Sequence, residues 1–175
     1  MDKIAIFIDS GYLDKITIKF GFRIDYKKLI KDVSNKYELF RTYYYYCAPY
    51  SSPIPTEVEK KMQSKHSKFI YVMQQIPRLE LRKGKLEKRD SFYVQKRVDI
   101  LLAVDLVRLS WKNQIQAAAL ITGDSDFVPA VKDAKDSGII TKLYYHKECV
   151  HDELKHCCDD TIEITNSVIS SWKLI

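Results

Sequence analysis

The sequence predicts a three-layer α/β/α fold in which helices cover both faces of a mainly parallel sheet. Residues 4–8 form a continuous apolar run, and residues 117–122 form a second, largely apolar segment; both have the composition of strands that are buried on both faces. Strand-like and helix-like segments alternate along the rest of the chain, as in parallel sheets with right-handed helical crossovers. The length of 175 residues suits a single domain, which we assign to residues 1–175.

Apolar spacing and capping residues predict the elements of the N-terminal half. Asp25 and Thr56 each precede a helical pattern, and Thr56 is followed by Glu59 as in a capping box. The predicted elements are a strand over 4–8, a short irregular or helical turn before Gly21, a helix from Asp25 to about Tyr37, a strand over 40–48, a loop over 49–55 and a helix from Thr56 to about Gln75.

Four consecutive tyrosines, residues 43–46, fall in the second predicted strand. Neighbouring side chains of a strand point to opposite faces, so at most alternate rings can share a surface. This favours packing within the sheet and core over a platform for stacked nucleic-acid bases.

The C-terminal half continues the alternation. The helix over 98–111 is apolar around much of its circumference, and we expect it to be well buried. The predicted elements are a strand from residue 79 that leads into a basic hairpin or loop excursion over about 79–97, a helix over 98–111, a strand over 117–122, a helix from Ser125 or Asp126 to Gly138, a strand over 139–145, a short helix over 151–158 and a last strand over 161–164.

Two of the predicted strands run directly into aspartates. The run 4–8 ends at Asp9, and a second run leads through Gly123 to Asp124 and Asp126. Ligands of open parallel sheets bind beyond the carboxyl ends of the strands, where the strand order reverses. We expect these strands to be neighbours at that point, so that their carboxylates converge. Asp126 would lie at a helix N-terminus, where the positive potential favours its charge.

The helix over 98–111 supplies a further acid. Asp99 lies near its start, whereas Asp105 is turned by about 120° around the helix axis, so the two do not share a face. Asp99 is therefore the better ligand. The predicted catalytic and metal-binding residues are Asp9, Asp99, Asp124 and Asp126.

Convergent carboxylates repel one another unless protons or a cation compensate their charge. An oxygen-only set suits Mg2+ or Mn2+, and such ions promote phosphodiester hydrolysis by lowering the pKa of a water molecule and stabilising the leaving oxygen. The structural alternative is that these aspartates cap helices and turns, as aspartate often does beside Gly and Ser. For the two strand ends taken together, we favour the metal site.

A second group of metal-capable side chains lies near the C-terminus, but its spacing fits no common zinc finger or ribbon. Its members are His146, Cys149, His151, His156 and Cys157. The four cysteines of the chain are unevenly placed for a disulfide framework, so we expect reduced thiols.

Basic residues exceed acidic ones, 29 against 23, and the formal net charge is +6. Because the expected ligands are acidic, the excess base must lie elsewhere, which suits a polyanionic partner such as RNA. A charge run is often only a solvated loop, and Ser125 can also serve as a helix cap. The predicted substrate-binding residues are Ser10, Arg82, Lys83, Lys85, Lys88, Arg89, Lys96, Arg97 and Ser125.

No apolar run approaches the roughly 18 residues that a membrane helix needs, and the N-terminus lacks the layout of a signal peptide. We therefore expect a cytoplasmic protein without a membrane partner. The sequence also leaves room for a homodimer.

Two blocks of sequence resemble the LabA-like branch of the NYN domain, in the PIN-like nuclease superfamily. They are QKRVDILLAVDLV at 95–107 and LITGDSDFVPAV at 120–131, and they are more specific together than the Ile-Asp ending alone. The resemblance covers nearly the whole chain. Family members often carry Asn two or three residues beyond the first Asp, where this chain has Gly11 and Tyr12.

The resemblance implies a PIN-like (Rossmann-like) three-layer fold and a metal-dependent ribonuclease. It also implies acidic ligands at Asp9, Asp99, Asp124 and Asp126. Similar sequences suggest that Lys96 reaches the scissile phosphate, and the equal alternative is a solvated charge at the start of the helix. We therefore predict an endoribonuclease that uses Mg2+ or Mn2+. The alternative is a non-catalytic module on the same fold that binds RNA or a protein partner. A haloacid dehalogenase-type phosphatase fits less well, because Gly11 stands where that chemistry uses a second Asp.

Overall fold

The fold is built on one sheet of six parallel strands. The computed structural model describes residues 1–89 and 92–174, with side chains for all of these except residues 86–89 and 92–96. The strand order is β3-β2-β1-β6-β7-β8. The bounds are β1 Lys3–Asp9, β2 Glu38–Tyr46, β3 Leu79–Lys83, β6 Ala117–Ile121, β7 Ile140–Tyr145 and β8 Asp160–Glu163. Strands β4 (Lys85–Arg89) and β5 (Phe92–Lys96) form a separate antiparallel hairpin.

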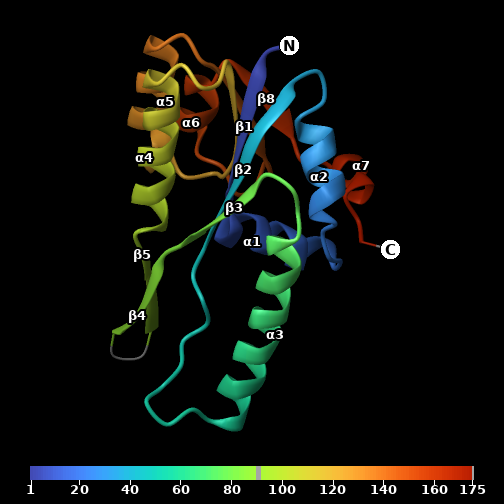
Figure 1. The fold of residues 1–175 in the computed structure, drawn as a ribbon, viewed down its shortest axis with the longest axis vertical. Coiled ribbons are helices and arrows are strands. Elements are labelled where there is room, and N and C mark those ends of the chain that lie inside the picture. The colour runs from blue at the N-terminus through green and yellow to red at the C-terminus, as the bar shows by residue number, and fades with distance from the viewer. Residues whose placement is uncertain (90–91, 175) are drawn as a thin grey trace.

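Helices cover both faces of the sheet, which confirms the predicted three-layer α/β/α fold (Figure 1). One face packs against α1 (Ser10–Phe20), α2 (Tyr26–Val33), the end of α3 (Glu57–Gln74) and α7 (Asn166–Ser171). The other face packs against α4 (Val98–Trp111), α5 (Val128–Asp136) and α6 (Asp152–Cys157). A short 3-10 turn, η1 (Ser125–Phe127), precedes α5.

The alternation of side chains along the strands separates the two halves of the core. Tyr43 and Tyr45 pack with α4 on one face, whereas Tyr44 and Tyr46 pack on the other. All four rings are buried. The expectation that these tyrosines serve the core rather than a stacking surface is therefore confirmed.

The reversal of strand order lies between β1 and β6. From β1 the chain continues outward through β2 and β3, and it later returns to β6 on the other side of β1. Ile8 is the register partner of Ile121, so the two strands end side by side. This is the neighbour relation that the two Asp-terminated runs predict, and it places a ligand site beyond these ends.

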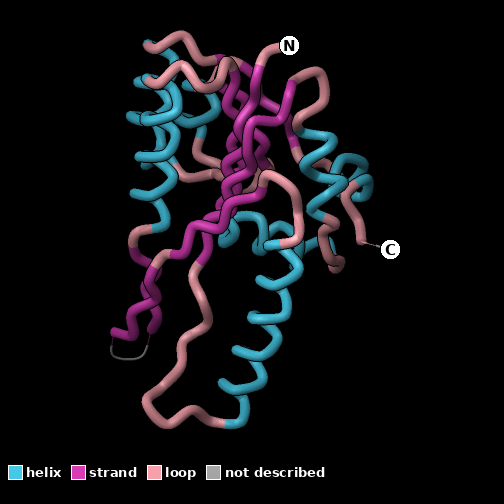
Figure 2. The backbone as a smooth tube through the Cα atoms, viewed as in Figure 1, coloured by secondary structure: helices cyan, strands magenta, loops and turns pink. Residues whose placement is uncertain are grey.

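Two elements project past the carboxyl ends of the strands. Helix α3 and the β4–β5 hairpin both extend beyond the sheet in this direction (Figure 2). The outer side of α3 carries the exposed residues Lys60, Lys61, Lys65 and Lys68. Two basic projections therefore flank the end of the sheet where β1 and β6 stop.

Three local predictions were wrong. The segment after Asp9 is a full helix, α1, because Asp9 caps it and Gly21 ends it with a φ of 72°. Helix α2 stops at Val33, earlier than the expected Tyr37, and its cap residue is Asp25 as predicted. Helix α7 was not foreseen. It is only six residues long, and it is held through the neighbouring Trp172, which is fully buried.

Helix α4 is less buried than its composition suggested. Its inner residues Leu102, Leu106 and Leu109 are in the core, but Ile100 and Trp111 are 67% and 60% exposed. A helix that is apolar around its circumference buries only the side that meets the sheet and α5. The outer side of α4 is thus an apolar stripe. Within the described residues, no helix is long and apolar enough to cross a membrane.

Candidate active site

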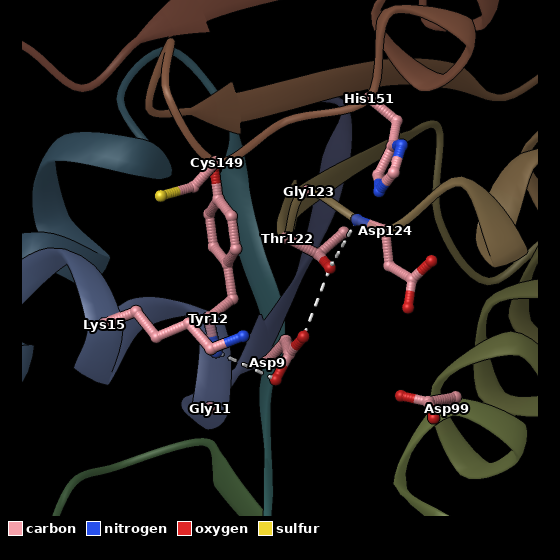
Figure 3. Close-up of a pocket in the computed structure, with 10 residues that line it drawn as sticks. All are labelled: Asp9, Gly11, Tyr12, Lys15, Asp99, Thr122, Gly123, Asp124, Cys149 and His151. Atoms are coloured by element: carbon pink, nitrogen blue, oxygen red, sulfur yellow. Dashed lines mark hydrogen bonds between the residues drawn. The ribbon is translucent and has the colours of Figure 1, made fainter.

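Three of the four predicted acids line one pocket at the switch point. Asp9 ends β1, Asp124 follows β6, and Asp99 is the second residue of α4. All three border a cavity of about 310 Å3, and their carboxyl groups turn toward this space (Figure 3). Elements that are far apart in the chain therefore bring three carboxylates to one site.

Asp9 is held in place from two sides. Its Oδ1 accepts a hydrogen bond from the backbone N–H of Tyr12 at 3.2 Å, and its Oδ2 accepts one from the hydroxyl of Thr122 at 3.2 Å. Burial raises the pKa of Asp9 above its usual value, and the negative charge of Asp124 adds to this rise, while the hydrogen bonds oppose it. The orientation of the Asp9 carboxylate is thus fixed, but no positively charged group is among the causes that shift its pKa.

Asp124 has a structural role as well as a place in the pocket. Its Oδ1 accepts a hydrogen bond at 3.0 Å from the backbone N–H of Asp126, so it caps the 3-10 turn η1. Capping uses one carboxylate oxygen and leaves the other for a ligand. The structural and the metal-binding interpretations of this residue are therefore compatible.

Asp99 belongs to the same electrostatic cluster. Burial raises its pKa, and the charges of Asp9, Asp124 and Asp126 raise it further. No cation enters this balance among its causes. A bound divalent ion would relieve this repulsion among carboxylates.

The donor chemistry fits Mg2+ or Mn2+, although the ligands are spread apart. Within the described part of the chain, no three acidic, His or Cys side chains are close enough to hold one ion directly. Mg2+ keeps several of its waters and needs only one or two protein carboxylates, so an open arrangement of oxygen donors can hold it. The wide spacing also leaves room for a substrate phosphate.

Asp126 and Ser125 face a neighbouring hollow. They border a second cavity of about 480 Å3 together with Lys132 and Glu153. Asp126 is exposed, and it acts on the first pocket through its charge at Asp99. The structure therefore brings Asp9, Asp99 and Asp124 together and places Asp126 beside them.

The predicted substrate-binding residues divide into distinct groups. Ser10 is buried and interacts with the hydroxyl of Tyr44, away from the pocket surface. Arg82 is occupied, because its Nε lies 2.9 Å from Oδ2 of the buried Asp105 and its guanidinium stacks over Tyr43.

The remaining basic residues lie around the β4–β5 hairpin. Lys83 and Lys85 are exposed where the chain enters it. Arg97 is exposed and adopts a φ of 75° immediately before α4. The side chains of Lys88, Arg89 and Lys96 lie outside the described residues.

Sequence reasoning missed seven residues of the pocket wall, of which Gly11, Thr122 and Gly123 lie beside the predicted acids and four lie farther away in the sequence. Tyr12, Lys15, Cys149 and His151 also line the cavity. Tyr12 and Lys15 are on α1, which the apolar pattern did not reveal as a helix. Cys149 and His151 come from the loop after β7, and only the tertiary fold brings them near Asp124 (Figure 3). A helix cap at Asp9 was the one signal that pointed to α1.

Gly123 fixes the position of that loop. A Cβ atom on Gly123 would lie 1.9 Å from the carbonyl oxygen of Cys149 and 2.5 Å from Cε2 of Tyr12. The backbone N–H of His151 donates to the carbonyl of Gly123 at 3.0 Å, and that of His146 donates to the hydroxyl of Tyr12 at 2.8 Å. Only glycine permits this close approach.

Comparison with known proteins agrees with the fold and identifies the family. A crystal structure of a protein of unknown function from Vibrio parahaemolyticus is similar, with a TM-score of 0.73 and 18% identity over 99% of this chain and 96% of that chain. No curated protein matches the chain. A family model described as the NYN domain matches residues 3–165. The chain therefore belongs to the NYN domain family, whose members are generally nucleases of the PIN-like superfamily.

Proposed function

We propose that this protein is a ribonuclease that depends on Mg2+ or Mn2+ and cuts within the RNA chain. The observation that carries the proposal is the convergence of Asp9, Asp99 and Asp124 on one cavity at the switch point of the sheet. The raised pKa of Asp99, caused by burial and by the charges of the other acids, supports a site suited to a cation. Membership of the NYN family supports nuclease chemistry over the alternatives.

Asp9, Asp99 and Asp124 would hold the ion, in part through the waters that it keeps, and Asp126 would add its charge from the side. A divalent ion bound there would lower the pKa of a water molecule and stabilise charge on phosphate oxygens. The protein contributes orientation, because the hydroxyl of Thr122 and the backbone of Tyr12 hold the Asp9 carboxylate in one direction. A second contribution is the tight contact at Gly123, which keeps the pocket wall fixed during binding.

The surroundings of the pocket suit a long polyanion. The exposed lysines of α3 and the basic segment that includes Lys83, Lys85 and Arg97 lie on the two projections beyond the strand ends. Lysine and arginine side chains bind nucleic acids chiefly through phosphates, so affinity should fall as salt rises. Arg82 is not counted among these phosphate contacts, because Asp105 engages its guanidinium.

The direct test is cleavage of a labelled single-stranded RNA by the purified protein with Mn2+ or Mg2+. We expect wild-type protein to produce internal cuts, EDTA to stop them, and Asp124→Asn to reduce the rate by at least about a hundredfold, as for loss of a key transition-state contact. Asp136→Asn is the matched control, because Asp136 is an exposed aspartate in the last turn of α5.

The same assay separates the alternatives. RNA binding without any product, unchanged in Asp9→Asn and Asp124→Asn, would identify a binding module instead of a nuclease. Turnover of a generic aryl phosphate would point to a phosphatase. The LabA-like branch, the single-domain boundary and a homodimer remain predictions, and sedimentation of the purified protein tests the last of these.

A further inference from the structure

We propose that Lys15 binds the substrate phosphate that enters the acidic pocket. This inference rests on the proposed function and extends it to a residue on α1 that the acidic motif does not include. Lys15 lines the same cavity as Asp9, Asp99 and Asp124. Its side chain reaches into the pocket on the Asp9 side, while Asp99 and Asp124 lie across from it (Figure 3).

The face of α1 that carries Lys15 is fixed at both ends. Tyr12, Lys15 and Lys19 are spaced three and four residues apart, so they share one side of the helix. The hydroxyl of Tyr12 accepts a hydrogen bond from the backbone of His146, and the amine of Lys19 pairs with Glu148. Lys15 lies between these two contacts, which hold this part of α1 against the loop after β7.

Lys15 is also available for an anion. Lys19 is engaged by Glu148, but none of the ion pairs formed among the described residues includes Lys15. Its ammonium group is exposed at the pocket edge. A lysine that points into an acidic pocket without pairing with its acids has donors left for a phosphate oxygen.

The charge balance of the pocket explains why a positively charged side chain would favour phosphate binding there. Three carboxylates line the cavity, and one divalent ion leaves one of their negative charges uncompensated. A phosphodiester would then approach a site of its own sign, which is unfavourable at close range. Together with one divalent ion, the charge of Lys15 offsets the three lining carboxylates, which lowers the repulsion that a phosphate meets. The ligand class is a phosphodiester of single-stranded RNA.

The test uses the full protein and compares Lys15→Met, Lys15→Arg and Lys31→Met. Lys31 is an exposed lysine in the last turn of α2, near the amino end of the strands, and it provides a matched loss of charge. The first measurement is the Kd for a fluorescent single-stranded oligoribonucleotide with Ca2+ present, which permits binding to be measured without turnover. The second is the Kd for Mn2+ alone by electron paramagnetic resonance.

We expect Lys15→Met to weaken RNA binding about tenfold, as for loss of one charge-assisted hydrogen bond. Lys15→Arg should restore most of it, and Lys31→Met should change it less than about twofold, as for one distant charge screened by salt. The Mn2+ affinity of Lys15→Met should stay equal or increase, because a positive charge has left the pocket. A general disturbance of α1 would weaken both ligands.

Two results would overturn the proposal: equal RNA affinities for Lys15→Met and Lys31→Met, or a loss of Mn2+ affinity in Lys15→Met. Both are read without RNA cleavage. A wild-type protein that binds RNA through Lys15 but never cuts it would instead overturn the proposed nuclease activity and leave the phosphate contact standing.

Discussion

The hydroxyl of Thr122 joins the ends of two strands. It donates a hydrogen bond to Oδ2 of Asp9 at 3.2 Å and accepts one from the backbone N–H of Asp124 at 3.5 Å. The side chain is fully buried. One hydroxyl therefore sets the position of the β1 carboxylate relative to the residue that follows β6, and the site depends on a group that is not itself acidic.

Replacing Thr122 by Val should shift the pH dependence of cleavage. The hydrogen bond from Thr122 lowers the pKa of Asp9, against the larger effect of burial, so its removal raises that pKa further. Asp9 then stays protonated to a higher pH, and the acid limb of the pH–rate profile moves toward neutral pH. We also expect a loss of about 1 kcal/mol in stability. Thr122→Ser keeps the hydroxyl and should resemble wild type, and an unmoved acid limb in Thr122→Val would contradict the role assigned to Thr122.

Divalent ions should stabilise the protein in a pH-dependent way. The pKa values of Asp9 and Asp99 are raised above 3.8, mainly by burial, so the folded protein binds more protons than the unfolded chain in the range between the ordinary and the raised values. The stability that these groups contribute is present below that range and is lost as the pH rises through it.

Above that pH range, Mn2+ can compensate the carboxylate charges that bound protons compensate at lower pH. At a concentration of about 100 times its Kd at pH 7, it should add about 2.7 kcal/mol at that pH. The same concentration should add less at pH 4, where protons compete with the ion for the carboxylates. Thermal unfolding with and without Mn2+ at both pH values measures this effect. Asp124→Asn should lose most of the increment at neutral pH, and an equal increment in this variant would argue against a site at Asp124.

Gly123→Ala should disrupt the wall of the pocket. The added Cβ would overlap the carbonyl of Cys149 and the ring of Tyr12, so the loop must move. We expect a cost of about 1–3 kcal/mol in urea unfolding and a large loss of RNA cleavage. Gly138→Ala is the control, because Gly138 has a φ of 87° but open space around it. It should lose about 1 kcal/mol through backbone strain and keep its activity.

Asp105→Asn should destabilise the fold and leave the chemistry largely intact. Asp105 is buried, accepts a hydrogen bond from Tyr45 at 3.0 Å and pairs with Arg82 and Arg108. Removing its charge takes one acidic partner from each arginine, and Arg82 keeps only its longer pair with Glu80 at 3.8 Å. Because both arginines reach solvent, we expect about 2 kcal/mol, less than the ~3–5 kcal/mol of a fully buried pair.

Urea unfolding of Asp105→Asn beside the exposed control Asp136→Asn measures the cost. Under conditions where the variant is fully folded, RNA cleavage by Asp105→Asn should stay within about tenfold of wild type. A tenfold change in rate corresponds to about 1.4 kcal/mol of activation free energy. A larger loss would place Asp105 in the active site, against its location in the core.

Much of the fold was predictable because its signals are local. The apolar runs of β1 and β6, the capping box at Thr56 and the start of α4 at Val98 are readable from neighbouring residues. The order of acids along the chain, combined with the rule for parallel sheets, also predicted that Asp9 and Asp124 lie at adjacent strand ends. Helix α1 was not predicted as a full helix, because Asp9 was interpreted only as a site residue. Asp9 also caps this helix, and the inward residues Leu13 and Ile16 follow it.

The sequence by itself determined the alternation of strands and helices and the three acids that follow strand and helix boundaries. The tertiary structure alone decided that Lys15 and His151 share a pocket with those acids, that Arg82 is paired with Asp105, and that the outer side of α4 is uncovered. The physical reason is the separation along the chain of the residues that interact. Strand and helix patterns depend on residues a few positions apart, whereas pocket walls and ion pairs depend on which distant surfaces the crossovers bring together.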